Sequence, residues 1–357
     1  AIRVVAPAGA GGVDGDTMSR IGVMICGHGS RDVEATHEFA ALVAHLRRHY
    51  ADRPVEAGYL EFARPVIREG LDRLRDKGVT EILAMPAMLF AAGHVKNDVP
   101  SVLNAWAAEN PEVRVRMARD LAIDGKLLRA AAERIEAALA LASDEITRAE
   151  TLLLVVGRGT SDSDANGNVA KVTRMLWEGM GFGHAETGYS GVAHPRTDEA
   201  LRRAIRLGYR RVVVFPYFLF TGVLVQRIYE QARAVAAEHP GIELVEAGYL
   251  NDHKLVVETF IERIEGIAAG DTAMNCQLCK YRTQILGFEH DQGAPQESHH
   301  HHVEGIGTDA DRHHHHGHHH HHGHGHHHGH GHHHHHLDAP EPDKVVVLKD
   351  GGTRRRG

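Results

Sequence analysis

The chain repeats itself at an offset of 130 residues, and this repeat restricts its fold more than any other feature. Ile21–Asp32 (IGVMICGHGSRD) matches Thr151–Asp162 (TLLLVVGRGTSD), and the apolar run around Pro86 matches the run around Pro216. Self-similarity at a fixed spacing indicates copies of one structural unit. We therefore expect two domains of the same fold.

Each copy alternates short apolar runs with longer amphipathic stretches, which are typical of buried parallel strands and of helices. Strands are predicted at Ile21–Cys26, Val55–Leu60, Glu81–Leu89, Val113–Ala118, Thr151–Val156, Ala185–Ser190, Arg211–Phe218 and Ile242–Ala247. Helices are predicted at Val33–Tyr50, Pro65–Lys77, Val95–Glu109, Gly125–Ala142, Ser163–Met180, Arg196–Leu207, Val223–Glu238 and His253–Ile267, with Pro65 in a first helical turn. Strands that alternate with helices form right-handed crossovers. The predicted fold class is α/β: two tandem domains, each a parallel sheet flanked by helices, which face each other across a cleft.

The composition divides the chain into five segments. We expect a disordered leader at 1–20 without a secretory signal, domains at 21–142 and 151–270, a polar linker at 143–150, and a tail at 271–357. Of the 33 histidines, 23 lie between His299 and His336, in a low-complexity segment that cannot form a packed core. This segment is predicted to be disordered.

Charge and hydropathy exclude several classes of protein. The formal net charge of −7 argues against a general nucleic-acid binder. No apolar run approaches the roughly 20 residues that a membrane span needs. Three cysteines do not make a disulfide framework, which favours a reducing cytoplasm.

Three polar residues of the first copy are not repeated in the second. The first copy has His28, Glu61 and His94, where the second has Arg158, Gly191 and Leu224. Since the surrounding scaffold residues do repeat, the difference places the chemistry in the first copy.

The spacing of these residues predicts that they meet. His28, Glu61 and His94 are each 33 residues apart, about the length of one strand–helix unit. Equal spacing puts them at the carboxyl edge of three consecutive strands, where open α/β sheets bind ligands. Two imidazoles and a carboxylate can hold a divalent metal or accept protons near neutral pH. The alternative, that His28 fills a turn and Glu61 caps a helix, does not explain their joint loss from the second copy.

Three segments resemble a known family. Gly27–Arg31 (GHGSR), Tyr59–Glu61 (YLE) and Phe90–His94 (FAAGH) are similar to the sirohydrochlorin chelatases of the class II chelatase group, in the long two-half form called cobaltochelatases. The resemblance covers roughly Arg20 to Ile267. It implies ATP-independent insertion of Co2+, as substrate metal, into the acidic tetrapyrrole sirohydrochlorin during cobalamin biosynthesis.

The resemblance also implies roles for the three residues. His28 and His94 become the metal-binding and proton-accepting groups, and Glu61 becomes their carboxylate partner. Insertion of Fe2+ for siroheme or of Ni2+ is the first alternative. A metal-storage or metallochaperone protein is the alternative from another class, although such a protein needs no cleft with this set.

An acidic tetrapyrrole needs cationic and N–H partners. The candidates near the predicted cleft edges are Ser30, Arg31, Lys96, Arg158 and Arg227. Ser30 follows the glycine turn, where N–H groups at a helix N-terminus can receive an anion. For the cationic side chains, ordinary surface charge is the alternative interpretation.

The tail carries two further metal-binding patterns. Cys276 and Cys279 form a C-x-x-C pair, but zinc and iron–sulfur clusters usually take four ligands, and Cys26 is the only other cysteine. The resemblance implies an Fe–S motif here, which would need a second subunit, as in a homodimer, or other ligands; a flexible thiol pair is the alternative. The histidine tract suits Co2+, Ni2+, Cu2+ and Zn2+, as metal buffer or, alternatively, as a purification tag.

Overall fold

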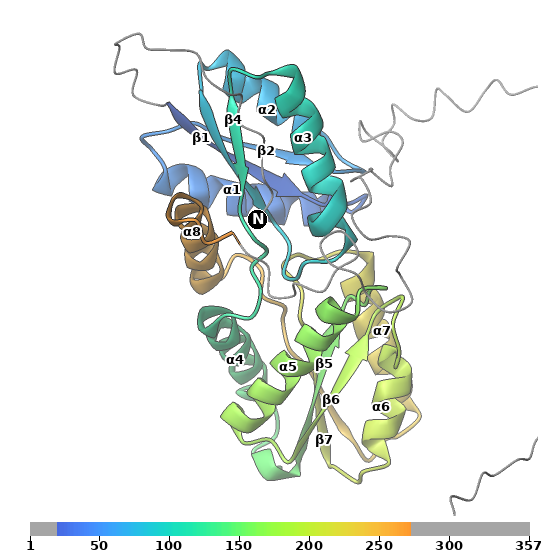
Figure 1. Cartoon of the computed structure of the whole chain (residues 1–357). Coiled ribbons are helices and arrows are strands. Elements are labelled where there is room, and N and C mark those ends of the chain that lie inside the picture. The colour runs from blue at the N-terminus through green and yellow to red at the C-terminus, as the bar shows by residue number, and fades with distance from the viewer. Residues whose placement is uncertain (1–19, 273–357) are drawn as a thin grey trace, which may run out of the picture. The chain divides into compact units, whose positions relative to one another are not determined.

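The computed structural model describes residues 20–272, which form two four-stranded parallel sheets (Figure 1). The first sheet has the order β2-β1-β3-β4, and its strands are β1 (Ile21–Gly27), β2 (Val55–Tyr59), β3 (Glu81–Pro86) and β4 (Arg114–Met117). The second has the order β6-β5-β7-β8, with β5 (Thr151–Gly157), β6 (His184–Tyr189), β7 (Arg211–Pro216) and β8 (Glu243–Glu246). The predicted fold class is confirmed. The predictions for the leader, the cysteine pair and the histidine tract lie outside the described residues.

Helices connect the strands in both halves. The first half contains α1 (Val33–His49), α2 (Ile67–Asp76), the π-helix η1 (His94–Asp98), α3 (Val99–Glu109) and α4 (Gly125–Leu139). The second half contains the 3-10 helix η2 (Arg148–Glu150), α5 (Ser163–Met180), α6 (Thr197–Ile205), α7 (Val223–Ala237) and α8 (Lys254–Ala269). Among the described residues, no helix has the length and apolar character that a membrane span requires.

The central strands explain why the sheets are buried on both faces. β1 pairs with β2 on one side and β3 on the other, and β5 pairs in the same way with β6 and β7. Val23 and Met24 are inaccessible to solvent although they point to opposite faces of β1. Helices must therefore cover both faces, as the continuous apolar runs predict.

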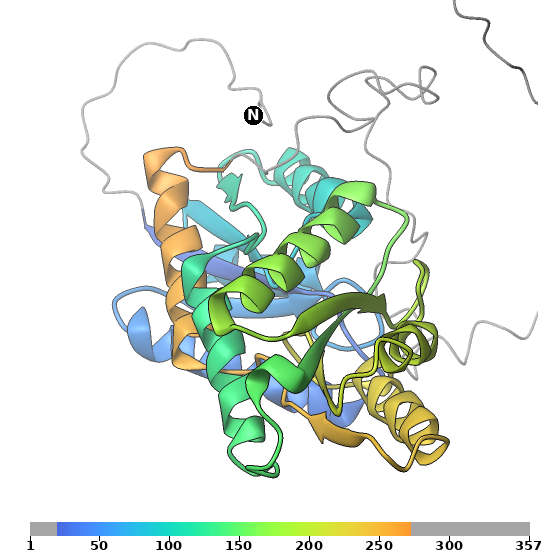
Figure 2. The same ribbon diagram turned by 90° about the horizontal axis from the view of Figure 1, so that it is seen from below.

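The last helix of each half packs against the other half. α4 follows the first sheet but contacts α5, β7 and β8, whereas α8 contacts α1 and β3, and the two helices lie side by side (Figures 1 and 2). Buried Arg263 of α8 donates hydrogen bonds to the Leu121 carbonyl and the Asp124 carboxylate, both at 2.8 Å. One hydrophobic core runs through both halves as a result. The ranges 21–142 and 151–270 thus describe sequence copies, while each sheet is completed by a helix from the other copy.

Several element boundaries differ from the sequence predictions. The strands predicted to reach Leu89 and Phe218 end at Pro86 and Pro216, because proline has no N–H for the ladder. Pro65 precedes its helix, which begins at Ile67. The helix predicted from Val95 begins instead with the π-helix η1, and that change of pitch matters for the site.

Candidate active site

A cavity of about 660 Å3 lies between the two halves. Its lining includes the turns that follow β1 and β5, at 27–31 and 157–160, and the loops that follow β3 and β7. Most of the wall is apolar, and aromatic rings meet across it: Phe39 lies 5.8 Å from Phe220, and Phe90 lies 5.8 Å from Tyr217, between ring centroids. The predicted cleft is confirmed, and it can receive a flat apolar ring system.

A glycine brings two strand ends together at the edge of the first sheet. Gly29 has φ +99°, and a Cβ there would lie 1.7 Å from the Glu61 carbonyl oxygen. The Glu61 N–H donates to the His28 carbonyl at 3.0 Å, so the turn after β1 and the segment after β2 are joined directly. Only glycine permits both this φ and this close approach.

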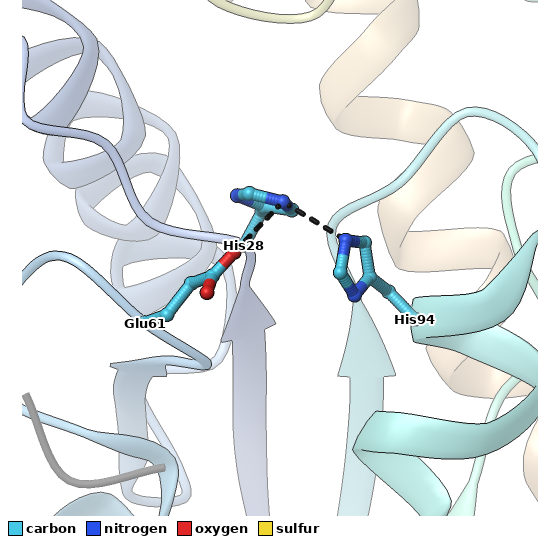
Figure 3. A group of neighbouring side chains, drawn as sticks. All are labelled: His28, Glu61 and His94. Atoms are coloured by element: carbon cyan, nitrogen blue, oxygen red, sulfur yellow. Dashed lines mark hydrogen bonds and ion pairs between the residues drawn. The ribbon is translucent and has the colours of Figure 1, made fainter. Parts of the chain in front are cut away.

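The structure brings His28, Glu61 and His94 into one cluster (Figure 3). The His28 Nε2 atom lies 3.0 Å from His94 Nε2 and 3.4 Å from Glu61 Oε1. One ligand atom from each residue lies within 4.8 Å of the other two. The imidazoles are partly accessible, whereas the Glu61 side chain is only 6% exposed. This set can bind a divalent ion or accept protons, as its residue types predict.

The outer nitrogen of each imidazole determines its tautomer. His28 Nδ1 lies 3.0 Å from the Gly29 carbonyl oxygen, and His94 Nδ1 lies 2.7 Å from Asp98 Oδ2. A carbonyl or carboxylate oxygen can only accept, so we assign the proton to Nδ1 in both rings. Both Nε2 lone pairs then converge, an arrangement that favours a cation or a shared proton between them.

Two residues of this site were missed by the sequence predictions. Asp98 contacts His94 from one turn along η1, and its signal was present in the repeat, because the second copy has Ile228 at that position. The Phe62 ring stacks on the His28 ring, with 6.1 Å between the ring centroids, and the Arg31 guanidinium lies over the Phe62 ring at 5.2 Å from its centroid. Phe62 gave no comparable signal, since its contacts arise from the tertiary fold.

Three of the five predicted substrate-binding residues line the cavity: Ser30, Arg31 and Arg158. The Ser30 hydroxyl accepts a hydrogen bond from the Asp32 N–H at 3.0 Å. Solvent reaches Arg158 through the open cavity, although protein surrounds it on the other sides. That desolvation lowers the pKa of Arg158, while the Glu61 carboxylate acts in the opposite direction. Arg158 and Glu61 therefore influence each other electrostatically.

The other two predicted residues lie away from the cavity wall. The Lys96 ammonium lies 2.7 Å from Asp162 Oδ2 and 3.7 Å from Asp164 Oδ2, and the lysine side chain is only 5% exposed. It links the two halves instead of lining the cavity. Arg227 is exposed on α7, outside the lining.

The structure describes one of the three cysteines, Cys26. Cys276 and Cys279 lie outside the described residues. Cys26 ends up inside β1 without solvent contact, and burial raises the pKa of its thiol to about 12. A buried thiol that stays protonated is a poor metal ligand.

Comparison with known proteins gives consistent results for both halves of the described region. The family model CbiX matches twice, at residues 22–138 and 152–267. A sirohydrochlorin cobaltochelatase of Priestia megaterium is 36% identical over 265 residues, which is 74% of this chain and 85% of the relative. A sirohydrochlorin ferrochelatase of the same organism is 29% identical over 63% of this chain and 82% of the relative.

A solved structure agrees with these matches. The sirohydrochlorin chelatase SirB from Bacillus subtilis subspecies spizizenii, solved in complex with cobalt, superimposes with a TM-score of 0.59 and 25% identity. The superposition covers 70% of this chain and 96% of that one. The two matches to the family model coincide with the two copies of the internal repeat.

Proposed function

This chain belongs to the CbiX family, and on that premise we propose that it inserts Co2+ into sirohydrochlorin without ATP, in cobalamin biosynthesis in the cytoplasm. One observation carries the proposal. The convergent nitrogen atoms of His28 and His94, with the Glu61 carboxylate, lie at the edge of a cavity of about 660 Å3. Cobalt as the preferred ion rests on the higher identity to the cobaltochelatase than to the ferrochelatase.

The chemistry requires both functions of the cluster. Insertion brings a divalent ion to the face of the macrocycle and removes two protons from pyrrole nitrogens. A neutral imidazole nitrogen can ligate the ion or take a proton, but one nitrogen cannot do both at once. Two histidines can therefore divide these tasks, with Glu61 as an adjacent proton acceptor.

The rest of the cavity suits the substrate. Aromatic side chains of both halves can contact the faces of the ring, which are apolar. Arg31 and Arg158 can pair with carboxylates at its edge, where guanidinium groups form paired hydrogen bonds. Arg158 occupies the position of His28 in the second copy, so the two halves would present a cation and a metal-binding group to the same substrate.

The direct test is an absorbance assay with purified protein. Sirohydrochlorin is mixed with Co2+, Fe2+ or Ni2+, and each rate is compared with the uncatalysed rate. We expect the largest acceleration with Co2+. A larger acceleration with Fe2+ would favour siroheme synthesis, and no acceleration with any ion would favour metal storage.

We further propose that His299–His336, outside the described residues, supplies metal to the cavity. Tethered imidazoles raise the local metal concentration without an active-site contact. A chain that ends after Ser298 should keep its kcat at saturating Co2+ and lose activity only when a chelator makes Co2+ scarce. Loss of kcat at saturating Co2+ would assign the tail to the catalytic machinery. A second chain that ends after Gly270 separates Cys276 and Cys279 from the tract.

A further inference from the structure

Asp98 is a buried carboxylate at a position where the second copy has an apolar residue. Its side chain is 1% exposed, and Ile228, the residue at the same place in the second copy, is fully buried. The second half therefore shows that an apolar side chain can be packed at this position of the fold. Burial of a carboxylate is unfavourable unless it is hydrogen-bonded, so packing alone does not account for Asp98.

The contacts of Asp98 connect it to the metal-binding cluster. Its Oδ2 atom accepts a hydrogen bond from His94 Nδ1 at 2.7 Å, and its Oδ1 atom accepts one from Asn97 Nδ2 at 3.0 Å. Both oxygens are thus held in place from the same π-helix, η1. With its proton on Nδ1, His94 directs the Nε2 lone pair toward His28.

The two histidines differ in the group behind them. His94 is backed by a carboxylate, whereas His28 donates from Nδ1 to the neutral Gly29 carbonyl at 3.0 Å. A carboxylate behind an imidazole fixes its orientation and raises its basicity as a ligand. His28 has its carboxylate on the other side, because Glu61 Oε1 lies 3.4 Å from the reactive Nε2 atom.

We propose that Asp98 is a positioning residue that makes His94 the principal ligand of the incoming ion, and that His28 and Glu61 receive the pyrrole protons. This division of labour rests on the proposed function. As the ion forms bonds to the macrocycle nitrogens, two N–H bonds break. The protons pass to His28 Nε2 and Glu61, and His94 releases the ion. No redox change or co-reactant is needed.

The first arm of the test measures Co2+ binding without any tetrapyrrole. It uses the full chain with the histidines of the tract at 299–336 replaced by glutamine, so that the tract does not bind the ion. Visible absorbance and calorimetric titration give the Co2+ affinity and ligand field of wild-type protein, Asp98→Asn, Asp98→Ile and His28→Asn. Asp98→Ile copies the second half and should fold. Asp120→Asn is the control, since it alters a buried carboxyl that does not contact His94.

We expect Asp98→Asn and Asp98→Ile to weaken Co2+ binding by roughly 10- to 100-fold and to change the absorbance spectrum. Asp98→Glu should restore part of the affinity, while His28→Asn should change it less than Asp98→Asn does. A wild-type affinity and spectrum for folded Asp98→Asn would overturn the proposal. Because this arm contains no tetrapyrrole, its result does not depend on whether the chain is a chelatase.

The second arm follows insertion by the native full chain. Asp98→Asn should raise the KM for Co2+ and leave the KM for sirohydrochlorin unchanged, whereas His28→Asn should lower kcat. An equal loss of kcat in both variants, with an unchanged KM for Co2+, would refute the division of labour. Inactivity of the wild-type chain would instead refute the proposed function, and the first arm would still decide the role of Asp98.

Discussion

The two halves of this molecule have nearly the same backbone and different polar side chains at the cavity. The turn after β1 and the turn after β5 make equivalent hydrogen bonds, Glu61 N–H to His28 O and Gly191 N–H to Arg158 O, both at 3.0 Å. Even the left-handed residues correspond, Phe62 at φ 63° and Val192 at φ 58°. Backbone strain that occurs in both halves belongs to the scaffold.

Four replacements distinguish the half that holds the cluster of His28, Glu61 and His94 from the other half. His28, Glu61, His94 and Asp98 correspond to Arg158, Gly191, Leu224 and Ile228. The comparison teaches that the two sheets have the same side-chain positions at their edges. The residue types at those positions determine what each half can bind. Under the proposed function, one half supplies the metal-binding groups and the other contributes to the substrate cavity.

The comparison predicts its largest effect for the histidines of the first copy. His28→Ala and His94→Ala should each reduce metal insertion on the order of 10²–10⁴-fold, since each removes a ligand or proton acceptor. Glu61→Gln should reduce it less, on the order of 10-fold. Absorbance kinetics with sirohydrochlorin and Co2+ measure the rates, and circular dichroism checks the fold. A folded His28→Ala protein with wild-type kinetics would remove the basis of the comparison.

The halves also differ in a buried carboxyl beneath the cavity loop. Asp120 accepts a hydrogen bond from the Ala91 N–H at 2.9 Å, and burial raises its pKa from 3.8 to about 6; the second copy has Tyr249 there. Between these values the folded state binds more protons than the unfolded state, so this group destabilises the fold as pH rises. This pKa difference lowers the free energy of unfolding by about 3 kcal/mol above pH 6.

Asp120→Asn removes that ionisation and can still accept from Ala91. The variant should therefore be more stable than wild type at pH 7.5, by up to about 3 kcal/mol, and the advantage should shrink toward pH 5. Denaturant unfolding at several pH values measures the free energy of unfolding. A stability difference that does not vary with pH would show that Asp120 titrates normally.

Two equivalent contacts between the halves differ in strength. Lys96 pairs with Asp162 at 2.7 Å in a buried position, and its counterpart Gln226 lies 3.4 Å from Asp32 at the surface. Lys96→Gln should lower the free energy of unfolding by about 1–3 kcal/mol, because it removes a buried cation from two partly buried carboxylates, Asp162 and Asp164. Gln226→Ala should change it by less than about 0.5 kcal/mol. Equal effects in chemical denaturation would contradict the asymmetry.

The smallest effect is expected on the cavity side of the second copy. Arg158→Ala should raise the KM for sirohydrochlorin about 10-fold and lower kcat less, the pattern of lost uniform binding. Co2+ affinity in the variant should stay at the wild-type level. Steady-state kinetics at varied sirohydrochlorin concentration measure both constants. An unchanged KM would show that Arg158 does not contact the substrate.

The sequence predicted the repeat, the parallel sheets and the meeting of His28, Glu61 and His94, because these follow from periodicity and spacing. It did not predict the exchange of α4 and α8, since an amphipathic helix does not specify which of two similar sheets it covers. The sequence also did not show that Lys96 forms an ion pair between the halves while Arg31 lines the cavity. The charge of a residue does not determine whether its side chain points into the cavity. Asp98 could have been predicted as a site residue, because the second copy has the apolar Ile228 at the same position.

The central claim is that, of the two copies, only the first binds the ion, and the location of the ion tests that claim most directly. Crystals of the full chain soaked in Co2+ can be measured at the cobalt absorption edge. We predict one anomalous peak in the cavity, at His94 Nε2 and beside His28 and Glu61. A cavity peak at Arg158 and Leu224, or a cavity without a peak at the histidines, would contradict the account.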